Sequence, residues 1–394
     1  MNEWLASRGM IEQAGGEQYL IQVMQEAPSS FYNLVSYAEK LKDLTTCRKV
    51  EEEAHKVIQK AQNLTVSRGE LVLEAQGLFA EISTEQASES LFHIHEAAAN
   101  TFLEMHEKMT AAAAGKTMIK GIQTGIHDLD QKLGDIEPGC LTVIAARPAM
   151  GKTTMMQVIA SNVAIFQQKP VLIMSGEMPK EQIAMRMCCA AGPADISKVR
   201  NAPHMLPQEE FTAYTRAVTM FANVPLQIND TSRPSIANIR ESIRKVKHQY
   251  GSIGAVFIDY LQIMKTTKPF AREDLKIAYF TGELKAMAKE FDCVIVLLSQ
   301  LNRELEKRPN KRPVLSDLRE SGAIEQDADQ IIFLYRDEIY HKDSKYQGIA
   351  EAILGKNRHG EPGTAYMHAQ LKYCQFSNLD SQAIEQIHGL GGAA

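Results

Sequence analysis

The chain of 394 residues is 44% hydrophobic and 23% charged, which is typical of a globular protein with about two domains. A net charge of −5 excludes a uniformly basic nucleic-acid coat, but it does not exclude a local basic groove. No apolar run approaches the ~20 residues of a membrane span, no signal peptide is evident, and six scattered cysteines form no C-x-x-C pair, so we expect a cytoplasmic protein with reduced thiols.

Residues 1–114 are expected to be almost entirely helical. Apolar residues at three- and four-residue spacing predict a helix from about residue 30 to 62, and the capping box "SRGE" (67–70) starts another. Together these predict an antiparallel hairpin over about 30–84. A further helix over 88–113 has an apolar seam, which either packs on its own domain or docks on a neighbouring subunit. The seam consists of Leu91, Ile94, Ala98, Phe102, Met105 and Met109.

The pattern changes after residues 111–121, and we place a domain boundary there. Short, nearly continuous apolar runs now alternate with helical patterns, as expected for a parallel sheet covered by helices on both faces. The predicted strands are 141–146, 170–175, 254–259, 293–299 and 330–335. The fold class is therefore α/β, and ligands of such sheets bind at the carboxyl ends of the strands.

The stretch "AARPAMGKTT" (145–154) lies between the first predicted strand and a predicted helix over 153–165, the setting of a phosphate-binding loop. The usual pattern has glycine where this chain has Ala146, but alanine fits at a strand end if its φ is negative. Lys152 would reach the β- and γ-phosphates, and the Thr153 hydroxyl would hold Mg²⁺. The residues expected to bind the nucleotide are Ala149, Met150, Gly151, Lys152, Thr153 and Thr154.

Three further strand ends have polar side chains that suit this chemistry. Asp259 either holds a Mg²⁺-bound water or caps a turn. Because Tyr260 follows it instead of Glu, the candidate base is Glu177, which would polarise the attacking water; the alternative is an ordinary surface Glu. Gln300 either senses the γ-phosphate by hydrogen bonding or is a buried polar residue at a strand end.

Several longer stretches resemble one family: "ARPAMGKTT", "SGEMPKEQIAMRM", "IDYLQIM", "LSQLNRELEKR", "DLRESGAIEQDAD", "YRDEIYH" and "GKNRHGEPGT". Their order and wording are similar to the bacterial replicative DNA helicases of the DnaB type, including phage-borne versions. The resemblance is dense over 117–376 and looser over 1–114. It implies a RecA-like P-loop ATPase core with a mostly parallel sheet, and it makes Ala146 a common family variant. The implied domains are a helical N-terminal domain with a shortened head (1–86), a linker helix and linker (87–120), and the ATPase domain (121–394).

The resemblance also implies roles for residues outside the phosphate loop. "GKNR" matches the family's K-x-R, so Lys356 and Arg358 would reach the ATP of a neighbouring subunit, the arginine as a finger that neutralises charge on the γ-phosphate. "DLRESG" matches the family's central-channel loop, which would place Arg319, Glu320 and Gly322 on the DNA backbone without reading bases.

The basic stretch 303–312 either adds to this channel or is a solvated charge run, and the basic stretch 265–272 is a weaker second candidate. The function implied is a hexameric helicase that uses ATP and Mg²⁺ to move 5′→3′ on single-stranded DNA, with a helicase loader and a primase as partners. A RecA-type protein of strand exchange or filaments is the alternative. A third alternative is an interaction factor that binds ATP without unwinding DNA.

Overall fold

The structure is a computed structural model, and it describes residues 31–62, 93–113, 115, 119–261, 264–266, 269–318, 322–358, 360–380, 383 and 387. The chain divides between Lys116 and Thr117 into two compact units, which are described separately below.

The first unit contains two long helices, α3 (Phe31–Gln62) and α5 (Ile94–Ala113), at the positions where helices are predicted. The capping box at 67–70 and Leu91 of the apolar seam lie outside the described residues. The seam residues Ile94, Phe102, Met105 and Met109 are exposed on α5, with at least 50% of each accessible. Both alternatives for this seam, packing on its own domain and docking on a neighbouring subunit, stay predictions.

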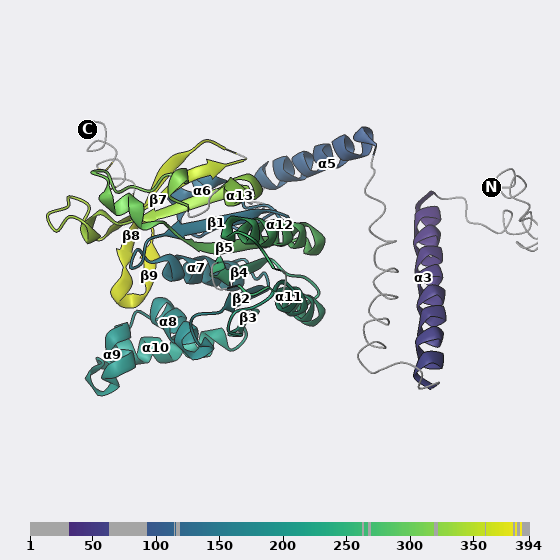
Figure 1. The fold of residues 1–394 in the computed structure, drawn as a ribbon, viewed down its shortest axis with the longest axis horizontal. Helices are drawn as coiled ribbons and strands as arrows, with labels where there is room; N and C mark the ends of the chain where they lie inside the picture. The colour runs from purple at the N-terminus through teal and green to yellow at the C-terminus, as the bar shows by residue number, and fades with distance from the viewer. Residues whose placement is uncertain are drawn as a thin grey trace, which may run out of the picture. The chain divides into compact units, whose positions relative to one another are not determined.

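The second unit is built on a nine-stranded sheet with the order β3-β2-β4-β5-β1-β6-β7-β8-β9 (Figure 1). The strands from β3 to β6 pair in parallel, and β7, β8 and β9 add antiparallel neighbours at one edge. Their bounds are β1 (Leu141–Ala146), β2 (Val171–Ser175), β3 (Leu226–Asn229), β4 (Ala255–Asp259), β5 (Val294–Gln300), β6 (Gln330–Tyr335), β7 (Ile349–Asn357), β8 (Gly363–Gln370) and β9 (Gln375–Ser377).

Helices cover both faces of the sheet (Figure 1). One hydrophobic core lies between the sheet and helices α6, α7 and α8, and the other between the sheet and α11, α12 and α13. The helices are α6 (His127–Leu133), α7 (Lys152–Ser161), α8 (Lys180–Ala191), α9 (Ile196–Asn201), α10 (Gln208–Phe221), α11 (Ile236–Tyr250), α12 (Glu273–Phe291) and α13 (Gly322–Asp327). Short helical turns are η1 (Asn162–Phe166), η2 (Pro203–Met205), η4 (Arg303–Lys307), η5 (Leu315–Asp317), η6 (Asp337–Ile339) and η7 (Leu371–Tyr373).

The central strand β1 shows why the apolar runs are continuous. All six of its residues are buried; Ile144 and Ala146 belong to the first core, while Val143 and Ala145 belong to the second. A strand buried on both faces needs apolar residues at every position, not only at alternate ones. The predicted α/β class with a mostly parallel sheet is confirmed, and all five predicted strands are present within a residue or so of their expected bounds.

Candidate functional site

The phosphate-loop stretch connects β1 to α7, in the strand–loop–helix setting that its sequence predicts. Ala146 is the last residue of β1, with its Cα opposite Gln300 of β5, and its φ is not positive. The backbone turns later, where Ala149 (φ 67°) and Gly151 (φ 97°) occupy the left-handed region. Helix α7 then begins at Lys152, so its free N–H groups and positive dipole end face the loop.

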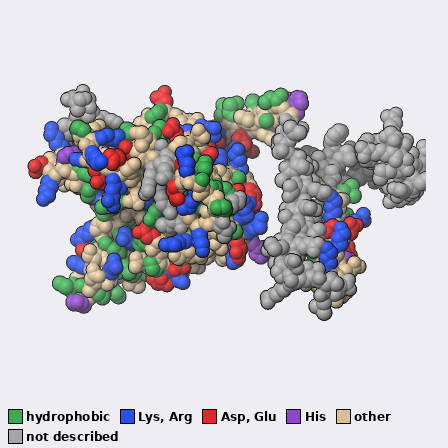
Figure 2. All heavy atoms as spheres, in the orientation of Figure 1, with side chains coloured by type: hydrophobic (Ala, Val, Ile, Leu, Met, Phe, Trp, Pro, Cys, Tyr) green, Lys and Arg blue, Asp and Glu red, His purple; other side chains and the backbone are tan. Residues whose placement is uncertain are grey.

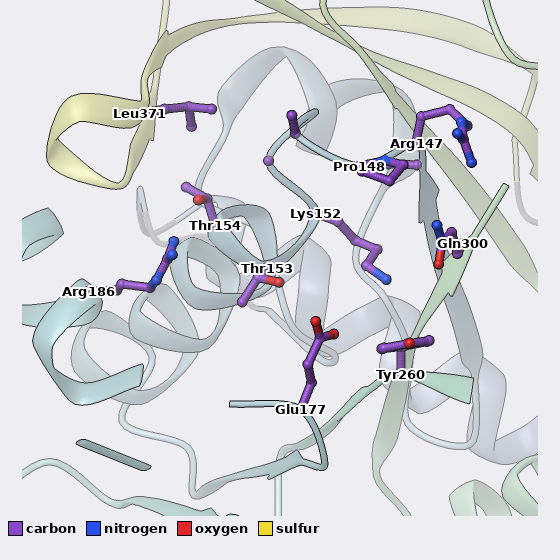
Figure 3. A pocket seen from close by; sticks show the side chains of 13 residues that line it. Arg147, Pro148, Lys152, Thr153, Thr154, Glu177, Arg186, Tyr260, Gln300 and Leu371 are labelled. Atoms are coloured by element: carbon purple, nitrogen blue, oxygen red, sulfur yellow. The ribbon is translucent and has the colours of Figure 1, made fainter. Parts of the chain in front are cut away.

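A cavity of about 430 Å³ opens above this loop at the carboxyl ends of the strands (Figure 3). Five of the six residues expected to bind nucleotide line it, and the side chain of Met150 instead lies in the hydrophobic core. The lining residues are Ala146, Arg147, Pro148, Ala149, Gly151, Lys152, Thr153, Thr154, Glu177, Arg186, Tyr260, Gln300 and Leu371.

Asp259 lies behind the cavity wall and contacts both key side chains of the loop. The Thr153 hydroxyl donates a hydrogen bond to its Oδ2 at 3.1 Å, and Lys152 Nζ lies 3.9 Å from its Oδ1. Among the described residues this buried Oδ1 has no hydrogen-bond partner. Lys152 Nζ also lies 4.5 Å from the centre of the Tyr260 ring, an arrangement that stabilises the cation.

Burial disfavours the charged forms of both Asp259 and Lys152. Burial raises the pKa of Asp259, and Glu177 adds to the rise, while Lys152 and Thr153 oppose it. Burial likewise lowers the pKa of Lys152, against the attraction of Asp259 and Glu177. A buried cation and carboxylate with an unused oxygen are suited to binding further charged groups, because the two charges do not satisfy each other fully.

Glu177 and Gln300 complete the cavity from two neighbouring strand ends. Glu177 follows β2 and is exposed, with its carboxylate directed toward Lys152 and Thr153 (Figure 3). The amide of Gly176, beside it, donates to the carbonyl of Asp259 at 3.0 Å, which ties the ends of β2 and β4 together. Gln300 ends β5 and is half-buried beside the loop.

Lys356 and Arg358 lie at the opposite end of the sheet from the cavity of their own chain. Strand β7 is antiparallel to β6, and Asn357 is opposite Gln330, which starts β6, whereas the phosphate loop follows the end of β1. Lys356 Nζ donates to the Ala328 carbonyl at 2.7 Å. Arg358 donates to Asp329 at 2.9 Å, although 60% of its side chain is exposed.

The predicted DNA-contacting segment is described only in part. Arg319 and Glu320 lie outside the described residues, and Gly322 begins α13. Gly322 lines a hollow of about 580 Å³ together with Arg272 and the first residues of α12. Two of the three stretches considered for DNA contact, 265–272 and the one that contains Gly322, therefore meet at one hollow.

Two arginines of the basic stretch 303–312 are held by ion pairs within the fold. Arg308 donates to Asp317 at 2.5 Å, and Arg312 forms two hydrogen bonds of 2.7 Å to the buried Glu351. The solvated-run interpretation is therefore wrong for these two arginines, because ion pairs within the fold hold them.

Several residues that line the cavity were not among the predicted site residues, and the positions of three of them are informative. Arg147 lies inside the loop motif, Arg186 is on α8 nine positions after Glu177, and Leu371 begins η7 near the end of the chain. Arg147 could have been singled out as the one charged residue of the loop motif besides Lys152. No local sequence pattern shows that Arg186 faces the cavity from α8, or that Leu371 approaches it from a distant part of the chain.

Two expectations from composition can also be compared with the described part of the chain. Its six cysteines are free thiols, of which five are buried and Cys47 is exposed. Within that part no helix is long and apolar enough to span a membrane, and no three His, Cys, Asp or Glu residues cluster as a metal site.

Comparison with known proteins gives consistent matches. The family model described as the DnaB-like helicase C terminal domain matches residues 121–378. The Replicative DNA helicase DnaB of Pasteurella multocida is 36% identical over 388 residues, which cover 96% of this chain and 81% of that protein. A solved DnaB-like replicative helicase, reported with its interactions with primase, aligns with a TM-score of 0.73 and 30% identity over 96% of this chain and 87% of its own. A second solved structure, described as an ATPase domain, aligns with a TM-score of 0.68 and 33% identity, covering 74% of this chain and all of that domain.

Proposed function

The chain belongs to the family of DnaB-like replicative DNA helicases, and from this premise we propose how its residues use ATP to unwind DNA. It is an ATP-dependent DNA helicase that acts in replication. The observation that best supports a working site is the Thr153–Asp259 hydrogen bond beside Lys152, because it joins a phosphate loop to a strand-end carboxylate.

ATP would bind with its phosphates over the loop that links β1 and α7. The free N–H groups at the start of α7 and the helix dipole attract the phosphate oxygens. Lys152 would move from the Tyr260 ring to the β- and γ-phosphates, which gives its partly satisfied charge stronger partners. Thr154 and Arg186 line the other side of the same cavity.

The residues present fit a Mg²⁺ ion bound with the nucleotide. Asp259 offers a buried carboxylate oxygen without a hydrogen-bond partner among the described residues, and the Thr153 hydroxyl is already within 3.1 Å of the other oxygen. Hydroxyl and carboxylate oxygens are the ligands that Mg²⁺ prefers. When bound, the ion would neutralise charge on the β- and γ-phosphates.

Glu177 is proposed as the base that orients and deprotonates the attacking water. Its exposed carboxylate faces the cavity next to Lys152, where a water could lie between it and the γ-phosphate. Gln300 would donate a hydrogen bond to the γ-phosphate from the end of β5. Gln300 ends β5 next to Ala146 of the phosphate-loop strand. Loss of the γ-phosphate would therefore remove a hydrogen bond from the end of β5.

Hydrolysis is proposed to require a second subunit. Lys356 and Arg358 lie at the far end of the sheet from their own cavity, so they are suited to act on a neighbour's ATP and not on their own. A guanidinium supplied in trans stabilises transition-state charge and accelerates comparable reactions ~10³–10⁵-fold. We propose that the ring is a hexamer and that the exposed seam of α5 docks on the adjacent subunit.

DNA binding is proposed at the segment containing Arg319, Glu320 and Gly322, next to the hollow shared with Arg272. Contacts to the phosphate backbone bind any sequence, which a helicase requires. The proposed direction of movement is 5′→3′, and a helicase loader and a primase are the proposed partners. Separating one base-pair step costs ~1.4 kcal/mol on average, well within what ATP hydrolysis can supply.

A strand-displacement assay on a forked duplex with either a 5′ or a 3′ tail would test this function. We expect unwinding that depends on ATP and on the 5′ tail, and none with the Lys152→Ala variant. Mixing Arg358→Ala with Glu177→Gln subunits should restore part of the ATP hydrolysis that each variant lacks alone. Electron microscopy with ATP and single strands should show closed rings; open helical filaments would instead favour the RecA-type alternative.

A further inference from the structure

Arg147 is the second residue of the phosphate-loop motif, yet its side chain donates hydrogen bonds to residues outside the loop. It extends beside Gln300 toward the end of β5 (Figure 3). Its Nη1 donates to the Leu301 carbonyl at 3.0 Å, and its Nε donates to Glu306 Oε1 at 2.8 Å. Only 9% of this side chain is exposed, so the guanidinium depends on these two acceptors for compensation.

The acceptors of Arg147 belong to the segment that follows β5. Leu301 is held twice, because its N–H also donates to the Ala146 carbonyl at 3.2 Å. The segment from 301 to 318 closes on itself just beyond β5: Leu301 and Leu318 form an isolated antiparallel bridge, and the Asn302 N–H donates to the Asp317 carbonyl at 2.9 Å.

Buried and ion-paired side chains hold this segment in place. Leu305 is buried, and the Arg308–Asp317 pair joins two parts of the segment. The Arg312–Glu351 pair fastens the segment to β7. Two hydrogen bonds and one bridge thus join the phosphate loop to Leu318, and Arg319 of the proposed DNA-contacting segment is the next residue in the chain.

We propose that Arg147 is a positioning residue that couples the nucleotide in the cavity to single-stranded DNA through Leu301 and Glu306. The proposal rests on the function proposed above, since it assigns the route between the ATP and DNA sites. When the loop closes on phosphates, residue 147 shifts, and its two hydrogen bonds carry that shift to the base of the DNA-contacting segment. Coupling of this kind is a free energy shared by both sites, so each ligand changes the affinity of the other by the same factor.

The test measures that factor with Glu306→Ala in the full chain, because glutamine would keep an oxygen that still accepts from Arg147. Glu306 does not line the cavity and is 42% exposed, so the variant should fold and keep its ATPase rate without DNA. A fluorescent oligo-dT is titrated with a non-hydrolysable ATP analogue present and then with ADP. We expect the ratio of the two DNA dissociation constants to approach one, a loss of about fivefold, which is the lower end of typical allosteric factors. The effect of DNA on affinity for the ATP analogue should shrink equally.

Glu304→Ala is the matched control, because Glu304 lies on the same turn and pairs only with the exposed Lys307 among described residues. It should keep the wild-type ratio. Arg147→Lys retains the charge but loses the planar guanidinium that donates to two acceptors, so it should also lower the ratio. Its thermal midpoint shows whether it folds. A wild-type ratio in Glu306→Ala, or an equal loss in Glu304→Ala, would overturn the coupling route. A wild-type protein without ATPase activity or DNA binding would instead overturn the proposed function itself.

Discussion

Replacing Asp329 with Asn should destabilise the ATPase unit in a manner that depends on pH. The Asp329 carboxylate is 3% exposed and accepts hydrogen bonds from the Leu141 amide at 2.8 Å, Lys285 at 2.5 Å and Arg358 at 2.9 Å. Burial alone would raise the pKa of Asp329, but the hydrogen bonds from Lys285, Leu141 and Arg358 outweigh it and hold the pKa below its ordinary value.

The magnitude follows from which bonds asparagine can replace. Its carbonyl oxygen can still accept from the Leu141 amide, but the charge-assisted bond to the mostly buried Lys285 is lost, at about 1.5–3 kcal/mol. Arg358 is 60% exposed, so its pair adds at most about 1 kcal/mol. The expected loss is roughly 2–4 kcal/mol, or about 5–10 °C in the thermal midpoint of a unit of this size.

The direction of the pH dependence is fixed by the lowered pKa. A carboxylate whose folded pKa is depressed stabilises the fold above its unfolded pKa, near 3.8, and this stabilisation is lost as the pH falls through the folded pKa. Thermal unfolding followed by circular dichroism should therefore show a constant difference between wild type and Asp329→Asn from pH 8 to about pH 5. The difference should shrink in more acidic buffer. Asp343→Asn, at an exposed position, is the control. A difference that persists undiminished at pH 3, or no difference at pH 7, would refute this reasoning.

Three further outcomes are expected. Lys152→Ala should abolish ATP hydrolysis in a coupled phosphate assay, and unchanged turnover would remove the cavity from the mechanism. Arg319→Ala should weaken single-strand binding regardless of sequence and reduce the slope of log affinity against log salt by about one, whereas an unaltered slope would place Arg319 away from the DNA. Arg336→Gln removes the 3.2 Å hydrogen bond from Arg336 to the carbonyl of Ala149, whose backbone is left-handed, so KM for ATP should rise more than kcat falls. Adding Ala149→Gly to the same chain should recover part of the lost affinity, because glycine adopts this backbone conformation without strain. No recovery would argue that Arg336 does not shape the loop.

The central strands were predictable because burial on both faces leaves a continuous apolar run, as in β1 and β5. The missed strands lack that signal. β3 has only four residues, all of them half-buried, and β7 includes Glu351, a charged residue at a buried position. Glu351 is tolerated there because Arg312, 39 positions earlier, pairs with it through two hydrogen bonds. Such a pairing cannot be read from either residue's neighbours in the sequence.

The candidate site divides in the same way. Lys152, Thr153, Glu177 and Gln300 were predictable because each occupies a strand end or a loop of recognisable pattern, and parallel strands bring these ends to one edge. The partners of Arg147 were not predictable, because Glu306 lies 159 positions away on a short helical turn that has its own local ion pair. Local patterns identify groups that must meet at a sheet edge, whereas contacts between loops depend on how those loops fold back.

The two ends of the phosphate-loop motif differ in how strictly they require glycine. Ala146 ends β1 between Gln300 and Leu334 in register, with a φ that is not positive, so its methyl group is simply part of the buried sheet. Gly151 has φ 97°, and a Cβ there would lie 2.6 Å from the Phe376 ring of β9. Alanine at 151 would therefore meet both backbone strain and a steric clash, while alanine at 146 meets neither. The first glycine of the pattern is dispensable where a strand supplies extended backbone. The second is required, because the turn onto α7 needs a left-handed backbone and β9 fills the space that a side chain would occupy.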